Sequence, residues 1–411
     1  MYISLRALSG ACCLFAVAAC ATASDILTLE SAQRLALARS RSLPAQDFAA
    51  AAARDLAVAA GQLPDPVLKA GIDNLPVSGA DRLSLGADFM TMRRIGISQE
   101  LTSSEKRRWR AERYEAEAAR ALSEKRALSA ALERDTTLAW LELYFARESD
   151  KLLATLEVQS KQEVNASRSA LSGGRATLAD QVTAEMGVSQ IAERRIESAR
   201  RVQVAQTALR RWVGDAGLEK LGPLPDMSAG ASPNVSDHPH LAALHGQEQI
   251  AKAESGLAQA ARKQDWTVEV AFQQRGAGYS NMVSFGVSVP LQWDRDKRQN
   301  REIAARRLQE QQAQAELEEA QRELAAMAQS QLAEWQAGVA RVKQYRDTTL
   351  PLAERRQEAV LAEYRGGKAA LADVLAVRRA AVDTRLQAVD AEAAMAKAWV
   401  QLNYLKAGGQ P

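Results

Sequence analysis

The feature that most constrains this chain is a proline-free stretch from about Ser103 to Leu171, rich in Ala, Leu, Glu and Arg. A helix of that length would extend about 100 Å, because an α-helix rises about 1.5 Å per residue. Helices in compact domains usually have about 8–20 residues, so an ordinary globular domain does not accommodate such a rod. The stretch therefore predicts an elongated molecule built on coiled-coil helices.

A phrase at the end of this stretch returns later in the chain. LSGGRATLAD begins at Leu171 and YRGGKAALAD begins at Tyr364, 193 residues further on. Strand-like segments upstream repeat at an offset of 190 residues, so that Gly286 corresponds to Gly96 in the sequence. Solenoid repeats have periods of about 20–50 residues, so we interpret the chain as a duplicated half-molecule.

Each half is expected to contain a helix, a pair of strands and a long helical hairpin that breaks at the double glycine. The first repeat should cover 25–221 and the second 240–411, joined by a linker over 222–239 that is rich in Pro, Gly and Ser. The strand pairs are expected at about 65–101 and 265–292, and the hairpins at about 103–213 and 296–406.

Two details of the helices follow from Gly and Pro. The first helix should run from Leu29 to about Gly61, where Gly61 and Pro64 end it. Pro351 interrupts the long helix of the second repeat. It should kink that helix, because proline removes a backbone donor and clashes with the preceding turn.

The first 24 residues have the pattern of a secretory signal peptide. All three cysteines of the chain, Cys12, Cys13 and Cys20, lie in this segment, so the remainder contains no disulfide or thiolate metal site. Two processing sites compete. Residues 21–23 (ATA) fit an ordinary small-residue cleavage site, whereas residues 17–20 (VAAC) resemble a lipoprotein signal that would leave Cys20 as a lipidated N-terminus. Either route exports the protein.

The predicted strands alternate apolar and polar residues with a period of two. Val268, Val270 and Phe272 share one face, and Glu269 and Gln273 share the other. Such alternation is typical of a half-buried soluble sheet and equally of a lipid-facing barrel strand. Strands flanked by long rods behind an export signal favour the barrel. Four strands cannot close a barrel in lipid, so several copies would pool their strands, and three copies would supply twelve, within the known range.

Over nearly the whole mature chain this layout resembles the TolC family of trimeric outer-membrane efflux channels. The segments AGQLPDPVLKAGIDNLPVSG and FMTMRRIGISQELTSSEKRR are similar to the heavy-metal branch, the cobalt-zinc-cadmium and copper-silver channels. The resemblance implies a mainly α protein with a small transmembrane β part. Coiled-coil hairpins would form an α-barrel tunnel into the periplasm, and four strands per protomer would contribute to a 12-stranded trimeric β-barrel.

The resemblance also implies a function. The protein would be the outer-membrane channel of a tripartite efflux pump that exports heavy-metal cations from the periplasm or cytoplasm to the exterior. Its partners would be two further copies of itself, outer-membrane lipid, a periplasmic adaptor (membrane fusion protein) and a proton-driven inner-membrane transporter of the RND class. One alternative is an exit duct for drugs, dyes or secreted proteins. A second is a periplasmic coiled-coil adaptor or scaffold, which predicts a single hairpin per chain.

The remaining sequence features argue against other function classes. A net charge of +3 with interspersed signs does not indicate a nucleic-acid surface. No phosphate-binding loop or nucleophile motif is present in the sequence. We therefore expect neither enzymatic activity nor a cofactor.

The two double-glycine phrases resemble the family's periplasmic tip motif. The resemblance implies that the helices reverse at these glycines, because a reversal needs a left-handed backbone conformation that glycine adopts most readily. The expected turn residues are Gly173, Gly174, Gly366 and Gly367.

Asp180 and Asp373 follow these turns and match positions that line the closed end of the family's tunnel. In a trimer they would form a gate of six carboxylates that attracts cations. Alternatively, each aspartate only caps a first helical turn, where the helix dipole favours negative charge. Tyr364 matches a tip tyrosine of the family. Arg175 and Lys368 either pair with these acids or face solvent.

All three histidines of the chain, His238, His240 and His245, fall within eight residues. Histidine is the commonest metal ligand, so they are candidates for a metal site. The favoured interpretation is instead that Asp237 or His238 caps a helix whose first turn contains Pro239. Soft copper ions could also bind the thioethers of FMTMRR, but packing of these methionines in a strand or loop is the favoured interpretation.

Overall fold

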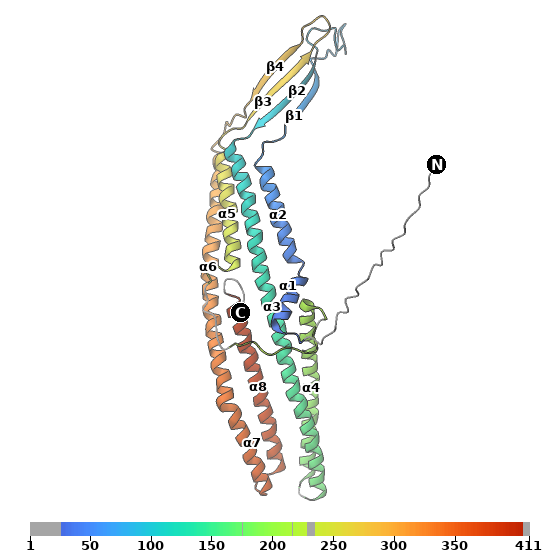
Figure 1. The fold of residues 1–411 in the computed structure, drawn as a ribbon, viewed down its shortest axis with the longest axis vertical. Helices are drawn as coiled ribbons and strands as arrows, with labels where there is room; N and C mark the ends of the chain where they lie inside the picture. The colour runs from blue at the N-terminus through green and yellow to red at the C-terminus, as the bar shows by residue number, and fades with distance from the viewer. Residues whose placement is uncertain (1–25, 175, 216, 228–234, 406–411) are drawn as a thin grey trace, which may run out of the picture.

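A computed structural model describes residues 26–174, 176–215, 217–227 and 235–405. Figure 1 shows an elongated molecule with a sheet at one end and helices that run from it to two tips at the other. The expected signal peptide, Cys20, Arg175 and part of the linker lie outside the described residues. No helix in the described part of the chain has the length and apolar composition that crossing a bilayer requires.

The first repeat contains one helix of 69 residues between much shorter elements. This helix begins after Ser103, whose side chain accepts a hydrogen bond from the backbone N–H of Lys106 (3.3 Å) and so satisfies one free donor of the first turn. The elements are α1 Leu29–Arg39, α2 Ser42–Ala60, β1 Val67–Asp73, β2 Met92–Leu101, α3 Ser104–Ser172 and α4 Leu178–Val213.

The expectation of a single helix from Leu29 to about Gly61 is wrong, because the helix ends at Arg39 and a second one begins at Ser42. Ser40 has an extended backbone conformation, and its hydroxyl accepts a hydrogen bond from the backbone N–H of Leu43 (3.4 Å). Serine competes with helical hydrogen bonding in this way.

The second repeat has the same order without a counterpart of α1 among the described residues. Pro351 does not end the long helix of the second repeat. Instead, the helical hydrogen-bond pattern changes over one π-helical turn, η1, shortly before the proline. Such turns are a known response to a break in the hydrogen-bond ladder. The elements are α5 Pro239–Ala260, β3 Trp266–Gln274, β4 Met282–Ser288, α6 Gln299–Gln344, η1 Tyr345–Thr349, α7 Leu350–Arg365 and α8 Leu371–Asn403.

The four strands form one antiparallel sheet in the order β1-β2-β3-β4. The two repeats meet at its centre, where β2 pairs with β3 and Gly96 lies opposite Ala271. A Cβ atom at Gly96 would lie 2.7 Å from the Cβ of Ala271, so the close approach of the two repeats requires glycine. β1 and β4 are the two edges of the sheet.

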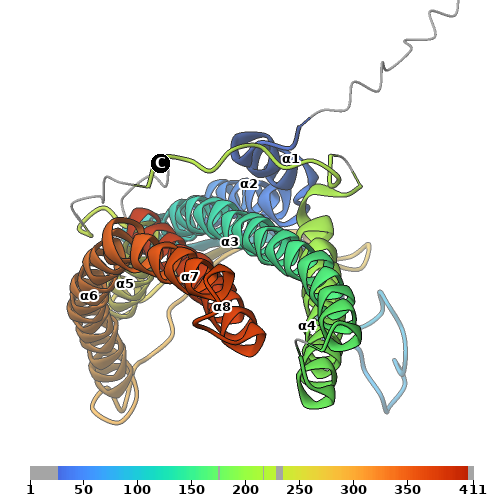
Figure 2. The same ribbon diagram turned by 90° about the horizontal axis from the view of Figure 1, so that it is seen from below.

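The helices are arranged in a curved layer, seen from below in Figure 2. Near the sheet, α3 packs between α2 and α5, and α6 packs beside α5. Toward the tips, α4 and α8 replace α2 and α5 along the same long helices. The shorter helices therefore follow one another along each long helix, as the resemblance implies.

The largest buried cluster lies midway along the rod, where α1 and the segment after α4 cover the convex side of the layer (Figure 2). Trp140 of α3 is fully buried there, and its indole N–H donates to the carbonyl of Leu27 (3.0 Å). The second repeat has a similar contact, in which half-buried Trp335 donates to the carbonyl of Met227 (3.3 Å). A curved layer has little interior, so its core forms where extra segments thicken it.

Candidate functional site

Both long helices end in a double-glycine turn at the tip. Gly174 and Gly367 have φ angles of +65° and +72°, and a Cβ atom at either position would have nothing within 4 Å. Gly173 and Gly366, directly before them, have negative φ angles of −88° and −82°. Backbone conformation rather than space therefore demands glycine at the second position of each turn.

Asp180 and Asp373 each accept a hydrogen bond at the start of the returning helix. The Oδ2 of Asp180 accepts from the backbone N–H and from the hydroxyl of Thr177, both at 2.8 Å. The Oδ2 of Asp373 accepts from the backbone N–H of Ala370 at 3.0 Å. Each aspartate thus has a helix-capping role. The hydrogen bonds from Thr177 hold the pKa of Asp180 below its usual value, so this carboxyl stays charged at neutral pH.

The other predicted tip residues lie around the same turns. Tyr364 is in the last turn of α7, is partly exposed, and its carbonyl accepts a hydrogen bond from the N–H of Gly367 (3.0 Å). Lys368 is exposed within the turn and makes no ion pair with any described residue. Its pairing with Asp373 is therefore absent from the described part of this protomer, and Arg175 lies outside that part.

The two hairpins contact each other above the tips, and the sequence alone did not indicate these contacts. Arg378 of α8 binds Glu163 of α3 (3.1 Å), and Arg194 of α4 binds Asp383 of α8 (2.8 Å). Leu375 packs between the two helices of the first hairpin. The charged partners are 215 and 189 residues apart, so no local pattern could have paired them.

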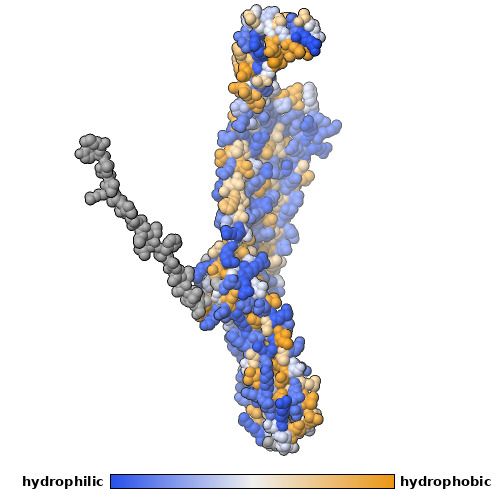
Figure 3. Space-filling view, turned by 90° about the vertical axis from the view of Figure 1, so that its right-hand side faces the viewer, coloured by the Kyte–Doolittle hydropathy of each residue, from blue (hydrophilic) through white to orange (hydrophobic). Residues whose placement is uncertain are grey.

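The two faces of the sheet differ in chemistry. One face carries a chain of ion pairs in which Glu269 binds Lys69 (2.6 Å) and Arg94 (3.5 Å), and Arg94 also approaches Asp73 (3.7 Å). The opposite face carries exposed apolar side chains, including Phe285 at 81% exposure. Figure 3 shows hydrophobic residues exposed around the strands, above helices with a largely hydrophilic surface.

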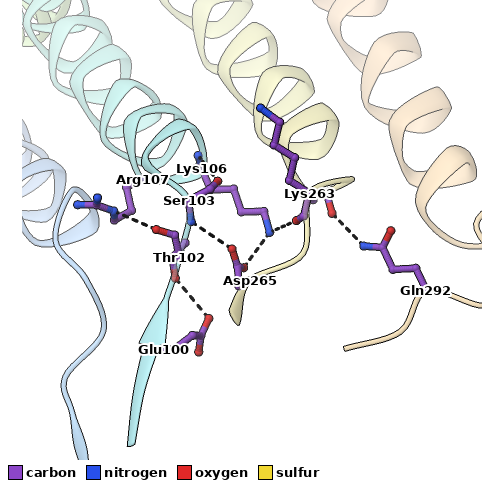
Figure 4. Close-up of polar contacts among 9 residues, drawn as sticks. Glu100, Thr102, Ser103, Lys106, Arg107, Lys263, Asp265 and Gln292 are labelled. Carbon is purple, nitrogen blue, oxygen red and sulfur yellow. Dashed lines mark hydrogen bonds and ion pairs between the residues drawn. The ribbon is translucent and has the colours of Figure 1, made fainter. Parts of the chain in front are cut away.

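Figure 4 shows the contact of the two repeats where the sheet meets the helices. The buried ammonium group of Lys106 donates to the carbonyl of Lys263 (2.6 Å) and to the carboxylate of Asp265 (2.8 Å). The other carboxylate oxygen of Asp265 accepts from the N–H of Ser103 (3.2 Å). One aspartate directly before β3 therefore fixes the start of α3.

The three histidines are not grouped into a ligand cluster in the described part of the chain. Nδ1 of His238 accepts a hydrogen bond from the N–H of His240 (3.2 Å) and caps α5, which confirms the capping interpretation. Burial lowers the pKa of His238. His245 contacts Glu248 instead (2.9 Å). Within the described ranges, no three His, Cys, Asp or Glu side chains are grouped closely enough to hold a metal ion.

The methionines of FMTMRR lie at the end of the sheet far from the helices. Met92 is the first residue of β2, and Met90 is 48% exposed in the preceding loop. The carbonyl of Met90 accepts a hydrogen bond from the side-chain amide of Asn74 (3.4 Å). Both positions are consistent with the strand-or-loop interpretation.

Comparison of the sequence with protein-family models and with curated proteins finds no match. Comparison of the structure with solved structures does find matches. CusC, whose structures concern conformational changes during folding and transmembrane channel formation, has a TM-score of 0.79 and 15% identity over 92% of each chain. VceC, an outer membrane protein from Vibrio cholerae, has a TM-score of 0.77 and 18% identity over 93% of this chain and 96% of its own. The outer membrane channel CmeC from Campylobacter jejuni has a TM-score of 0.78 and 13% identity over 93% and 86%.

This chain has the fold of outer-membrane channel proteins. The mainly α fold with four strands per protomer, expected from the sequence, is confirmed. The three identities are 15%, 18% and 13%, so these comparisons show the fold and do not separate a heavy-metal branch from the others.

Proposed function

We propose that this protein is the outer-membrane channel of a tripartite efflux pump. The sheet carries the proposal, because one face is apolar and exposed, the other is charged, and each edge strand has one side unpaired within the described protomer. Three copies side by side would close twelve strands into a barrel with its apolar face toward lipid and its ion pairs toward the lumen. The helices would continue that lumen into the periplasm for about 100 Å.

The tips would form the periplasmic gate of this channel. Six carboxylates, from Asp180 and Asp373 of three copies, would surround the narrow end and attract cations. The capping role of these residues is compatible with that function, since the hydrogen bonds from Thr177 lower the pKa of Asp180 and favour its charged form. A periplasmic adaptor would contact the double-glycine turns, and a proton-driven RND transporter of the inner membrane would supply the energy. The channel itself would catalyse no reaction.

The gate is tested by replacing Asp180 and Asp373 with Asn, which removes charge while keeping an oxygen acceptor for the cap. Cation preference in planar-bilayer conductance should fall in the double variant. Glu193→Gln is a matched control, because it removes one acidic charge from α4 away from the turn. Unchanged selectivity in the double variant would reject the carboxylate gate and leave helix capping as the role of the two aspartates.

The cargo that we propose is heavy-metal cations. Support comes from the resemblance of the strand segments to the heavy-metal branch and from the capacity of a carboxylate gate to attract cations. A duct for drugs, dyes or secreted proteins would have the same architecture. A periplasmic adaptor or scaffold is disfavoured by the two hairpins and the exposed apolar sheet face.

Growth of a strain that lacks the protein separates these functions. We expect sensitivity to one or more of copper, silver, zinc, cadmium, cobalt and nickel, restored by the intact gene. Sensitivity to antibiotics or dyes alone would retain the channel and reject the metal cargo. Release of the protein by osmotic shock without detergent would reject the channel.

For the exported N-terminus we propose cleavage after residues 21–23 rather than lipidation of Cys20. Leu27 accepts a hydrogen bond from Trp140, which lies 36 residues beyond the start of α3 at the sheet. Leu27 therefore lies about 50 Å from the proposed membrane surface. The seven residues from Cys20 to Leu27 span at most about 25 Å. Mass spectrometry of the mature N-terminus tests this proposal, and a diacylglyceryl group on Cys20 would overturn it.

A further inference from the structure

The contact between the two repeats at the base of the sheet has a specific composition (Figure 4). The second strand and long helix of the first repeat, β2 and α3, meet the first strand and short helix of the second repeat, β3 and α5. Lys106 in the first turn of α3 binds Asp265, which directly precedes β3 (2.8 Å). On the surface of the same contact, Lys263 binds Glu105 (2.6 Å).

Both members of the buried pair have a counterpart in the other repeat. Asp65 precedes β1 and lies 200 positions before Asp265, which precedes β3. Lys297, in DKR before α6, lies 191 positions after Lys106, in EKR at the start of α3. The duplication thus places an acid and a base at the two outer margins of the protomer.

These counterparts are unburied in the isolated protomer. Asp65 is exposed and forms no hydrogen bond or ion pair with another described residue. The Lys297 side chain is 83% exposed, and its nearest acid is Asp294, three residues earlier, at 3.7 Å. The apolar side chains of Phe48 and Val58 on α2 are 73% and 67% exposed. The margin formed by α2 and β1 therefore offers one unsatisfied acid beside exposed apolar surface and an unpaired strand edge.

We propose that the contact between two copies of this chain repeats the contact within it, with Asp65 of one copy bound to Lys297 of the next. This inference rests on the proposed function, because a closed assembly is what brings the two margins together. The partner is a second copy because the α6–β4 margin is the duplicate of the α3–β2 margin, whose partner the chain already supplies. Charge complementarity and the unpaired edges of β1 and β4 agree with this occupant.

The same shift defines how the edge strands would pair. Gly96 and Ala271 are opposite each other within the chain. Gly286 lies 190 positions after Gly96 in the sequence, and Gly71 lies 200 positions before Ala271. In the inferred contact between copies, Gly286 would therefore lie opposite Gly71. Both are small residues on the charged face of the sheet, as Gly96 and Ala271 are, so the inferred pairing keeps every side chain on its proper face. Phe285 would then lie opposite Ile72 on the apolar face.

Cysteine cross-linking tests the contact, because residues 21–411 contain no native cysteine. Asp65→Cys with Lys297→Cys, treated in membranes with a short bis-maleimide, should give covalent dimers and trimers on denaturing gels. Each single variant should give neither. Glu105→Cys with Lys263→Cys is the matched control at the internal contact, and it should cross-link within one chain and leave only monomers.

A charge exchange provides a second measurement that does not depend on cysteine. Lys297→Asp alone should lower the temperature at which the native trimer dissociates in mild detergent, and Asp65→Lys with Lys297→Asp should restore most of the loss. A trimer that forms without cross-linking at 65 and 297 and without rescue would overturn the inferred contact but retain the channel. Absence of any trimer would overturn the proposed function together with the contact.

Discussion

α3 and the α6–η1–α7 helix hold equivalent places in the two repeats but differ in burial. α3 contributes a long series of buried side chains, including Trp140, whereas no residue of α7 is buried. The difference follows from neighbours. Among the described helices, α3 packs against neighbours on both sides, whereas the other long helix packs mainly against α5 and α8. The long helix of the first repeat is therefore covered on both sides within the protomer, and that of the second repeat presents an open side.

The largest expected effect tests this difference at the paired tryptophans. Trp140→Ala should lower the free energy of unfolding by about 3–5 kcal/mol, because it removes a fully buried indole. Trp335→Ala, at a half-buried site with a similar hydrogen bond, should cost about 1–2 kcal/mol. Thermal unfolding of the detergent-solubilised protein, followed by circular dichroism, measures both. Equal losses would contradict the proposed asymmetry of the two repeats.

The ion pairs between the hairpins should differ for the same reason. Arg378→Met should cost about 1–3 kcal/mol, since it leaves the carboxylate of Glu163 unpaired at a side-chain exposure of only 11%. Arg194→Met should cost about 0–1 kcal/mol, because both members of its pair are more than 40% exposed. Urea unfolding at low and moderate salt distinguishes them. A larger loss for Arg194→Met would indicate that burial does not rank these contacts.

The tip turns, in contrast, should behave alike in both repeats. Gly174→Ala and Gly367→Ala each force a side chain into a positive φ angle and should each cost about 1–2 kcal/mol. Gly366→Ala is the control in the same turn, where φ is −82°, and it should be nearly neutral. Hydrogen exchange of the flanking helix amides reports the local stability. Tolerance of alanine at 174 but not at 367 would show that the turns are not equivalent.

The smallest expected effect is on the pH dependence of the first tip. The pKa of Asp180 is lowered in the folded protein by its hydrogen bonds to Thr177. Its stabilising contribution is therefore full above the ordinary aspartate value of about 3.9 and is lost as pH falls through the lower, folded value.

Asp180→Asn should remove this acid-dependent loss of protection in the first turn of α4. Thr177→Val should reduce it only in part, because the backbone donor remains. NMR titration of the carboxyl group measures the shift directly. An ordinary pKa for Asp180 would contradict the capping geometry.

Sequence reasoning succeeded where the signal is local and missed contacts between distant segments. The strands, the long helices and the double-glycine turns could be predicted because periodicity, glycine and proline act over a few residues. The break at Ser40 was missed because a single serine that ends a helix is a weak signal beside an Ala-rich pattern. The contact between Lys106 and Asp265, 159 residues apart, left no pattern that either segment carries alone.

The amino-acid sequence by itself determined that the chain is a duplicated rod with strands at one end and glycine turns at the other. Only the tertiary structure decided which margins of the protomer have their charged groups paired within the chain. Lys106 and Lys297 lie in similar segments, EKR and DKR, yet one is buried against Asp265 and the other is exposed. The reason is that local sequence sets backbone conformation, whereas burial of a charged group depends on a partner that folding brings to it.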